Sequence, residues 1–108
     1  YEIPLTIIVI NNNGGGIFES LPIAEKVNKF KEFFITPHNI DLSSVVKSFG
    51  ISYQLITSRS KLQQHLKHSL IKNVTSILEI QTDAAESSEL RNKYFSEVKN
   101  KLNKEFHR

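Results

Sequence analysis

A nearly unbroken apolar run over residues 5–10, rich in β-branched side chains, ends abruptly at three asparagines and three glycines. The run lacks the polar alternation of a half-exposed strand, and it is too short to span a membrane. It therefore predicts a strand that is buried on both faces, as is typical of a parallel sheet. Ligands of parallel sheets bind just beyond the carboxyl ends of the strands, and residues 11–16 fall at that position.

The residues of this amide loop, 11–16, suit one kind of ligand. An asparagine offers a neutral carbonyl oxygen and two N–H donors, so it can ligate a hard cation or bind a phosphate oxygen. Glycines allow positive φ angles and let main-chain atoms approach a ligand closely. The loop therefore predicts an oxygen-lined Mg²⁺ or Ca²⁺ site beside a phosphate. The alternative is a turn that only reverses the chain, with asparagine tolerating the left-handed conformation.

The rest of the chain reads as alternating helices and strands. Strands are expected over residues 51–56 and 74–80, and helices within 24–34 and over 60–71, where Leu62, Leu66 and Leu70 share a face. A short helix should be capped by Asp41 and followed by Gly50 in the left-handed position after its end, and a last helix should follow Asp83. This order predicts an α/β fold with parallel strands and right-handed crossovers.

Composition excludes several classes of function. The 108 residues suffice for one small domain, and the absence of cysteine rules out disulfides and thiol chemistry and fits a reducing compartment. The net charge is +3, and basic residues crowd the last helix, where Glu97 and Glu105 interrupt them. A solvated outer face explains that helix better than nucleic-acid binding does.

The histidines do not form a recognisable catalytic set. His65 and His68 are expected to be a solvated surface pair, since no carboxylate or cysteine lies beside them at ligand spacing. His107 belongs to a terminal basic run. For His38 two interpretations stay open: a role as an acid or base, and a structural role in which a hydrogen bond fixes its own loop.

Several short motifs point to a known family. They are Asn-Asn-Asn-Gly-Gly-Gly-Ile-Phe over 11–18, Leu-Pro-Ile-Ala over 21–24, Phe33-Phe34, Thr-Pro-His over 36–38, and Asp41-Leu42. Together they resemble the C-terminal part of the 2-succinyl-5-enolpyruvyl-6-hydroxy-3-cyclohexene-1-carboxylate synthases, the MenD family of thiamine-diphosphate enzymes. The resemblance implies that residues 1–108 are the C-terminal portion of a thiamine-diphosphate-binding domain of the PP type, a three-layer fragment with a parallel sheet.

The resemblance also implies roles for individual residues. Asn12 would ligate Mg²⁺ through its side chain and Gly14 through its carbonyl oxygen. Asn13 and Gly15 would lie against the diphosphate of the cofactor. Apolar residues would line the pocket for the thiazolium and the substrates, namely Ile17, Phe18 and Leu21, of which Ile17 also counts as a cofactor contact. No residue of this chain is assigned a catalytic role.

The activity implied is that of a transferase that decarboxylates 2-oxoglutarate and adds the succinyl unit to isochorismate, in menaquinone or phylloquinone biosynthesis. The family's Gly-Asp metal motif and its cofactor-activating glutamate match no segment here, so we expect them in the remainder of the enzyme and in a second subunit. The chain alone is then expected to be inactive and its parent a homo-oligomer of the cytoplasm, or of the plastid stroma in a photosynthetic eukaryote. Two alternatives stay open: another thiamine-diphosphate carboligase or decarboxylase, and a non-catalytic interaction module with the same fold.

Overall fold

The computed structural model describes residues 3–21 and 26–106. The chain divides into two compact units, and each is described by itself. The sheet unit comprises residues 1–13 and 38–82, and the second unit comprises residues 14–37 and 83–108. His107 and part of the motif over 21–24 lie outside the described residues.

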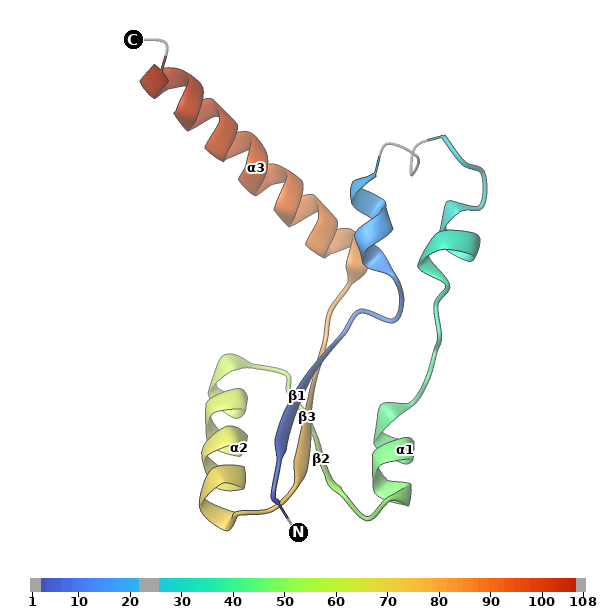
Figure 1. The fold of residues 1–108 in the computed structure, drawn as a ribbon, viewed down its shortest axis with the longest axis vertical. Helices are drawn as coiled ribbons and strands as arrows, with labels where there is room; N and C mark the ends of the chain where they lie inside the picture. Colours follow the sequence, from blue (N-terminus) through green and yellow to red (C-terminus); the bar gives the residue numbers. More distant parts are fainter. Residues whose placement is uncertain (1–2, 22–25, 107–108) are drawn as a thin grey trace. The chain divides into compact units, whose positions relative to one another are not determined.

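The sheet unit holds three parallel strands in the order β1-β3-β2: β1 (Thr6–Asn11), β2 (Ser52–Leu55) and β3 (Ser76–Gln81). The chain passes from β1 across to β2 through α1 (Leu42–Ser48) and returns to the central position through α2 (Arg59–Lys72). Crossovers of one hand that run in opposite directions place their helices on opposite faces of a sheet. Figure 1 shows α1 and α2 on opposite sides of the strands. The predicted three-layer α/β fold with a parallel sheet is confirmed.

Local hydrogen bonds explain where the helices of this unit begin and end. The Asp41 carboxylate accepts from the backbone N–H of Ser43 at 3.0 Å and caps α1, as predicted. Gly50 follows α1 with a φ of 68°, which also fits the prediction. Ser58 caps α2 through the backbone N–H of Lys61, and the left-handed Asn73 ends the helix.

The core of the sheet unit surrounds the central strand. Leu78 of β3 has no exposed surface, and Val46 of α1 and Ile56 after β2 are also buried. The predicted face of α2 is only partly right, since Leu70 is 67% exposed and the buried residue is its neighbour Ser69. The Ser69 side chain accepts a hydrogen bond of 2.7 Å from Ser76 of β3.

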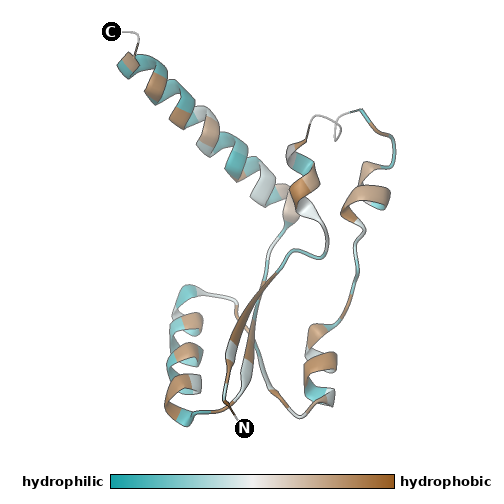
Figure 2. Ribbon diagram, in the orientation of Figure 1, coloured by the Kyte–Doolittle hydropathy of each residue, from teal (hydrophilic) through white to brown (hydrophobic). Residues whose placement is uncertain are grey.

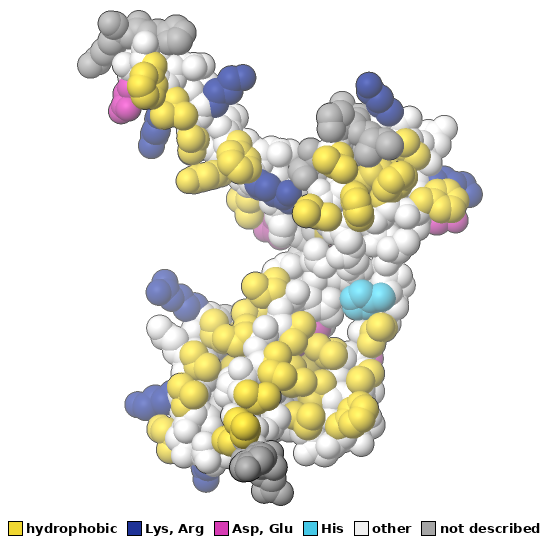
Figure 3. All heavy atoms as spheres, viewed as in Figure 1, with side chains coloured by type: hydrophobic (Ala, Val, Ile, Leu, Met, Phe, Trp, Pro, Cys, Tyr) yellow, Lys and Arg dark blue, Asp and Glu magenta, His cyan; other side chains and the backbone are white. Residues whose placement is uncertain are grey.

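The prediction that the first strand is buried on both faces is wrong for this chain. Ile7 and Ile8 are each 44% exposed and Ile10 is 69% exposed. The reason is strand order: among the described strands β1 pairs only with β3, so it lies at an edge of the sheet. Hydrophobic colour runs along β1 and β3 in Figure 2, and Figure 3 shows hydrophobic side chains over much of the visible surface of this unit.

The second unit contains a 3₁₀ helix, η1 (Gly16–Ser20), a π-helical turn, η3 (Lys31–Ile35), and α3 (Ala84–Phe106). The helix expected within residues 24–34 is therefore mostly wrong, although residues 24–25 lie outside the described part. Lys29 has a φ of 62° and Thr36 a φ of 44°, so the turn is bounded by conformations that a right-handed helix cannot continue through.

The last helix, α3, begins where it was predicted. The Asp83 carboxylate accepts from the backbone N–H of Glu86 at 2.8 Å. None of the described residues of α3 is buried, and its apolar residues Leu90, Tyr94 and Leu102 are exposed. Figure 2 shows polar and apolar residues alternating along it. Among the described residues no helix is both long and apolar enough to cross a membrane.

Candidate functional site

The amide loop leaves the sheet at the carboxyl end of β1, as the sequence predicts. Asn11 is the last residue of β1, where it lies in register with Gln81, and its carbonyl oxygen accepts from the backbone N–H of Thr82 at 2.9 Å. Asn12 and Asn13 then follow within the sheet unit. The loop therefore starts from a fixed point, because the strand before it is held in register with the central strand to its end.

The side chain of Asn11 joins the loop to the sheet. Its Nδ2 donates to Oε1 of Glu79 at 2.6 Å, and its Oδ1 accepts from the backbone N–H of Asn13 at 2.9 Å. The NH₂ group of Asn11 thus bonds the central strand, and its carbonyl oxygen bonds the loop. The path of the chain around Asn12 depends on this side chain.

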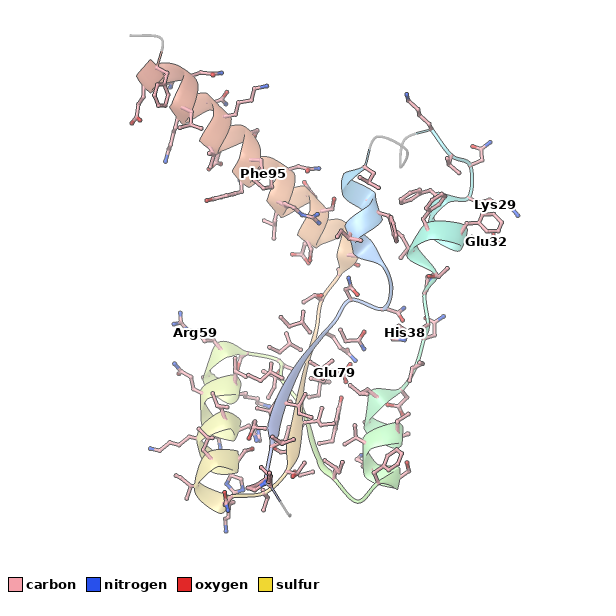
Figure 4. All side chains as sticks on the ribbon, viewed as in Figure 1. Lys29, Glu32, His38, Arg59, Glu79 and Phe95 are labelled. Carbon is pink, nitrogen blue, oxygen red and sulfur yellow. The ribbon has the colours of Figure 1, made fainter. Side chains whose placement is uncertain are left out.

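Glu79 is a buried carboxylate in the central strand, with 1% of its surface exposed. Besides Asn11 it accepts from the hydroxyl of Tyr53 on β2 and, at 3.4 Å, from Nε2 of Gln81. Ser76 faces α2, and side chains alternate along a strand, so Glu79 three residues later faces α1. Figure 4 shows Glu79 on that side of the strands.

The pKa values in this cluster reflect a carboxylate held in its charged form. Burial acts to raise the pKa of Glu79, but hydrogen bonds from Tyr53, Asn11 and Gln81 outweigh burial and leave the pKa below its ordinary value. Burial, the hydrogen bond to Glu79 and the charges of Glu79 and Asp41 raise the pKa of Tyr53 to about 12. Tyr53 is therefore a stable donor at neutral pH.

A second link holds the loop at Asn13. This residue is left-handed, with a φ of 59°, and its side chain forms a reciprocal pair with Asn39. Asn13 Nδ2 donates to Asn39 Oδ1 at 2.9 Å, and the backbone N–H of Asn39 donates to Asn13 Oδ1 at 2.8 Å. Nearby, His38 (Figure 4) accepts through Nδ1 from the backbone N–H of Ile40 at 3.0 Å, a hydrogen bond within its own loop of the kind that the structural interpretation predicts.

Two glycines of the loop, Gly14 and Gly15, are explained by a close approach of backbones. A Cβ atom on Gly14 would lie 2.5 Å from the carbonyl oxygen of Ile35, and one on Gly15 would lie 3.2 Å from that of Phe34. The backbone N–H of Gly15 donates to the carbonyl oxygen of Ile35 at 2.8 Å. Among the described glycines only Gly50 has a positive φ, so Gly14 and Gly15 serve packing rather than a left-handed turn.

The apolar residues after the glycines lie on or just beyond η1. Ile17 is 72% exposed and Leu21 is 47% exposed, so neither side chain lies in the core of this unit. Phe18 packs edge-on against Phe34 with ring centroids 6.1 Å apart, and Phe34 stacks on Phe30 at 5.1 Å. The aromatic cluster supports η1, while Ile17 and Leu21 keep apolar surface that can line a pocket.

Two predicted metal ligands suit a hard cation. The Asn12 side chain and the Gly14 carbonyl are neutral oxygen donors of the kind that Mg²⁺ accepts. The described residues contain no group of three or more His, Cys, Asp or Glu side chains that could hold a metal ion. These two residues can therefore supply only part of the shell of about six oxygens that Mg²⁺ requires.

The predicted residues are divided between the two units. Asn12 and Asn13 belong to the sheet unit, and the others, Gly14, Gly15, Ile17, Phe18 and Leu21, belong to the second unit. Asn12 is partly buried, and Asn13 directs both ends of its amide to Asn39. The chain itself keeps Asn12 and Gly14 two residues apart.

Comparison with known proteins decides the family. Residues 1–80 match the thiamine pyrophosphate enzymes over their C-terminal, TPP-binding domain. The chain belongs to the thiamine pyrophosphate enzyme family. The matched region includes all three strands as far as Ile80 and the whole amide loop.

Three relatives within this family share one name. The chain is 52% identical over 79 residues to a 2-succinyl-5-enolpyruvyl-6-hydroxy-3-cyclohexene-1-carboxylate synthase of Trichodesmium erythraeum. The aligned region covers 73% of the chain and 13% of the relative. Synthases of the same name from Rippkaea orientalis and Roseiflexus sp. are 45% and 34% identical over 87% and 76% of the chain, and 16% and 14% of their own lengths. The resemblance seen in the sequence motifs is confirmed, and the chain spans only a small part of these relatives.

Sequence reasoning missed the groups that hold the amide loop in place. Glu79, Tyr53 and Asn39 come from three separate segments, and nothing in their spacing indicates that they meet at the end of β1. One signal was present: an acidic residue within the apolar strand expected over 74–80 must find partners if both faces of that strand are covered.

Proposed function

We propose that this chain is part of a thiamine-diphosphate- and Mg²⁺-dependent synthase that decarboxylates 2-oxoglutarate and adds the succinyl unit to isochorismate, in menaquinone or phylloquinone biosynthesis. The observation that carries the proposal is the 52% identity over 79 residues, 73% of the chain, to a synthase of the corresponding name. Membership of the thiamine pyrophosphate enzyme family supports the cofactor.

In this proposal the chain contributes binding and orientation. Asn12 and Gly14 hold Mg²⁺, and Asn13 and Gly15 lie along the diphosphate. The cofactor, when bound, supplies the carbanion chemistry, so the protein has to hold and shield it. The exposed Ile17 and the neighbouring Phe18 and Leu21 provide an apolar wall that keeps water from the reacting atoms.

Activity requires more than this segment. Because the chain spans 13–16% of the relatives above, the acid–base group for the cofactor and the groups that bind the substrate carboxylates are proposed to come from the remainder of the enzyme and from a second subunit. We therefore expect the 108 residues alone to be inactive and the complete enzyme to be a homo-oligomer.

Replacement of Asn12 tests the proposal. In the complete enzyme, Asn12→Ala removes one neutral oxygen ligand, so the dissociation constant for thiamine diphosphate at limiting Mg²⁺ should rise by about tenfold or more. Excess Mg²⁺ and cofactor should restore much of the turnover with 2-oxoglutarate and isochorismate. Calorimetric titration and a steady-state assay measure the two effects, and Asn92→Ala, which truncates an exposed amide on α3, is the matched control.

The same measurements separate the alternatives. An Asn12→Ala enzyme with unchanged cofactor affinity would contradict the ligand assignment. A complete protein that binds thiamine diphosphate but turns over other 2-oxo acids would be another carboligase or decarboxylase of the family. A complete protein that binds neither cofactor nor Mg²⁺ would support the non-catalytic interaction module.

A further inference from the structure

We propose that Glu79 is a positioning residue for the metal-binding loop and acts through Asn11. This inference rests on the proposed function, because it takes Asn12 as a ligand of Mg²⁺. Its basis is the continuous set of hydrogen bonds from the buried Glu79 carboxylate to Asn11 and from Asn11 to the backbone of Asn13. The two residues that flank Asn12 are thus both fixed from the central strand.

The carboxylate determines which way the amide of Asn11 faces. An ionised carboxylate can only accept hydrogen bonds, so Asn11 must direct its NH₂ group toward Glu79. Its carbonyl oxygen is then left to face the backbone N–H of Asn13, where it accepts at 2.9 Å. A neutral amide in place of Glu79 would remove this constraint, because it presents a donor as well as an acceptor.

The hydrogen-bond donors around Glu79 keep its carboxylate ionised. A carboxylate with 1% of its surface exposed would be unstable without partners, and three donors, from Tyr53, Asn11 and Gln81, supply them. Tyr53 lies on β2 in register with Ile77, two residues before Glu79 on the same face of the sheet. All three strands therefore contribute a side chain, so the carboxylate is fixed on both sides of β3.

Glu79 acts on Asn12 through Asn11, whose side chain bonds both Glu79 and the backbone of Asn13. Groups that support a metal ligand without touching the metal orient that ligand before the metal binds. Their loss weakens metal binding by about tenfold or more, and we expect the same of the loss of Glu79. The second link, from Asn13 to Asn39, fixes the far side of the loop. Asn12 therefore lies between two residues, Asn11 and Asn13, that are both held by hydrogen bonds.

The test is Glu79→Gln in the complete enzyme. This variant keeps the volume of the side chain and should raise the dissociation constant for thiamine diphosphate at limiting Mg²⁺ by about tenfold, with much less change in turnover at saturating cofactor. Ser76→Ala is the matched control: it also removes a buried hydrogen bond from β3, but at the amino end of the strand. It should lower stability and leave cofactor affinity unchanged.

A double-variant cycle tests the route through Asn11. If Glu79 acts through Asn11, then Glu79→Gln in an Asn11→Ala background should cause little further loss of cofactor affinity. Ser76→Ala in the same background should behave as it does alone. Asn11→Ala also serves as the second variant if Glu79→Gln does not fold, because it breaks the same link from the less buried end.

The outcomes distinguish this inference from the proposed function. A complete protein that binds no thiamine diphosphate would overturn both. An enzyme in which Asn12→Ala weakens cofactor binding while Glu79→Gln, or Asn11→Ala in its place, behaves like Ser76→Ala would overturn the inference alone. Additive losses from Glu79→Gln and Asn11→Ala would show that Glu79 acts by another route.

Discussion

The phenol of Tyr53 illustrates how a single residue can make stability depend on pH. Its pKa is raised from 10.0 to about 12, chiefly by burial and then by its hydrogen bond to Glu79. The folded state therefore holds this proton more tightly than the unfolded state does. The resulting stabilisation is complete below about pH 10 and is lost as the pH rises through about 12.

Replacement of Tyr53 by phenylalanine checks this expectation. The free energy of unfolding in urea should differ between the protein and Tyr53→Phe by a constant amount below about pH 10, and the difference should shrink at higher pH. Tyr94→Phe is the control, since Tyr94 is 64% exposed on α3. A Tyr53 difference that stays constant up to about pH 12 would show that its pKa is not raised.

At the scale of elements, what the sequence could predict depended on local information. The strands and the caps of α1 and α3 follow from β-branched runs and from Asp41 and Asp83, all of which act within a few residues. The turn η3 was not predicted, because a left-handed Lys29 leaves no mark in the apolar spacing on which the helix was expected. The amide loop was placed correctly at the end of β1. Its supports were not, because they depend on a strand order that brings Glu79 beside Asn11.

The contact between the amide loop and η3 gives a prediction at this scale. In Gly14→Ala the new methyl group would lie 2.5 Å from the carbonyl oxygen of Ile35, so one backbone segment must move. We expect this to cost about 1–3 kcal/mol of the free energy of unfolding. Gly15→Ala should cost less, because its methyl group would lie 3.2 Å from the nearest backbone oxygen. Urea unfolding of both variants measures the difference, and equal costs would exclude close approach as the reason for glycine at position 14.

For the sheet unit as a whole, the order of the strands leaves an apolar edge. β1 pairs with β3 on one side. Ile7, Ile8 and Ile10 on this strand and Leu5 just before it are 44–69% exposed. An apolar edge strand is a template for pairing with another chain, and natural proteins protect such edges with charges. The 108-residue chain produced alone is therefore expected to self-associate through this strand.

One lysine on the edge should reduce this association. Ile10→Lys places a charge on β1, so the weight-average mass in sedimentation velocity should rise less with concentration than for the unmodified chain. Leu70→Lys is the matched control, because Leu70 on α2 is 67% exposed and Ile10 is 69% exposed, but Leu70 has no strand edge beside it to pair. If the two substitutions reduce association equally, apolar surface in general and not strand pairing drives it. If the unmodified chain stays monomeric at about 100 μM, a concentration at which exposed edges commonly aggregate, the edge does not pair at all.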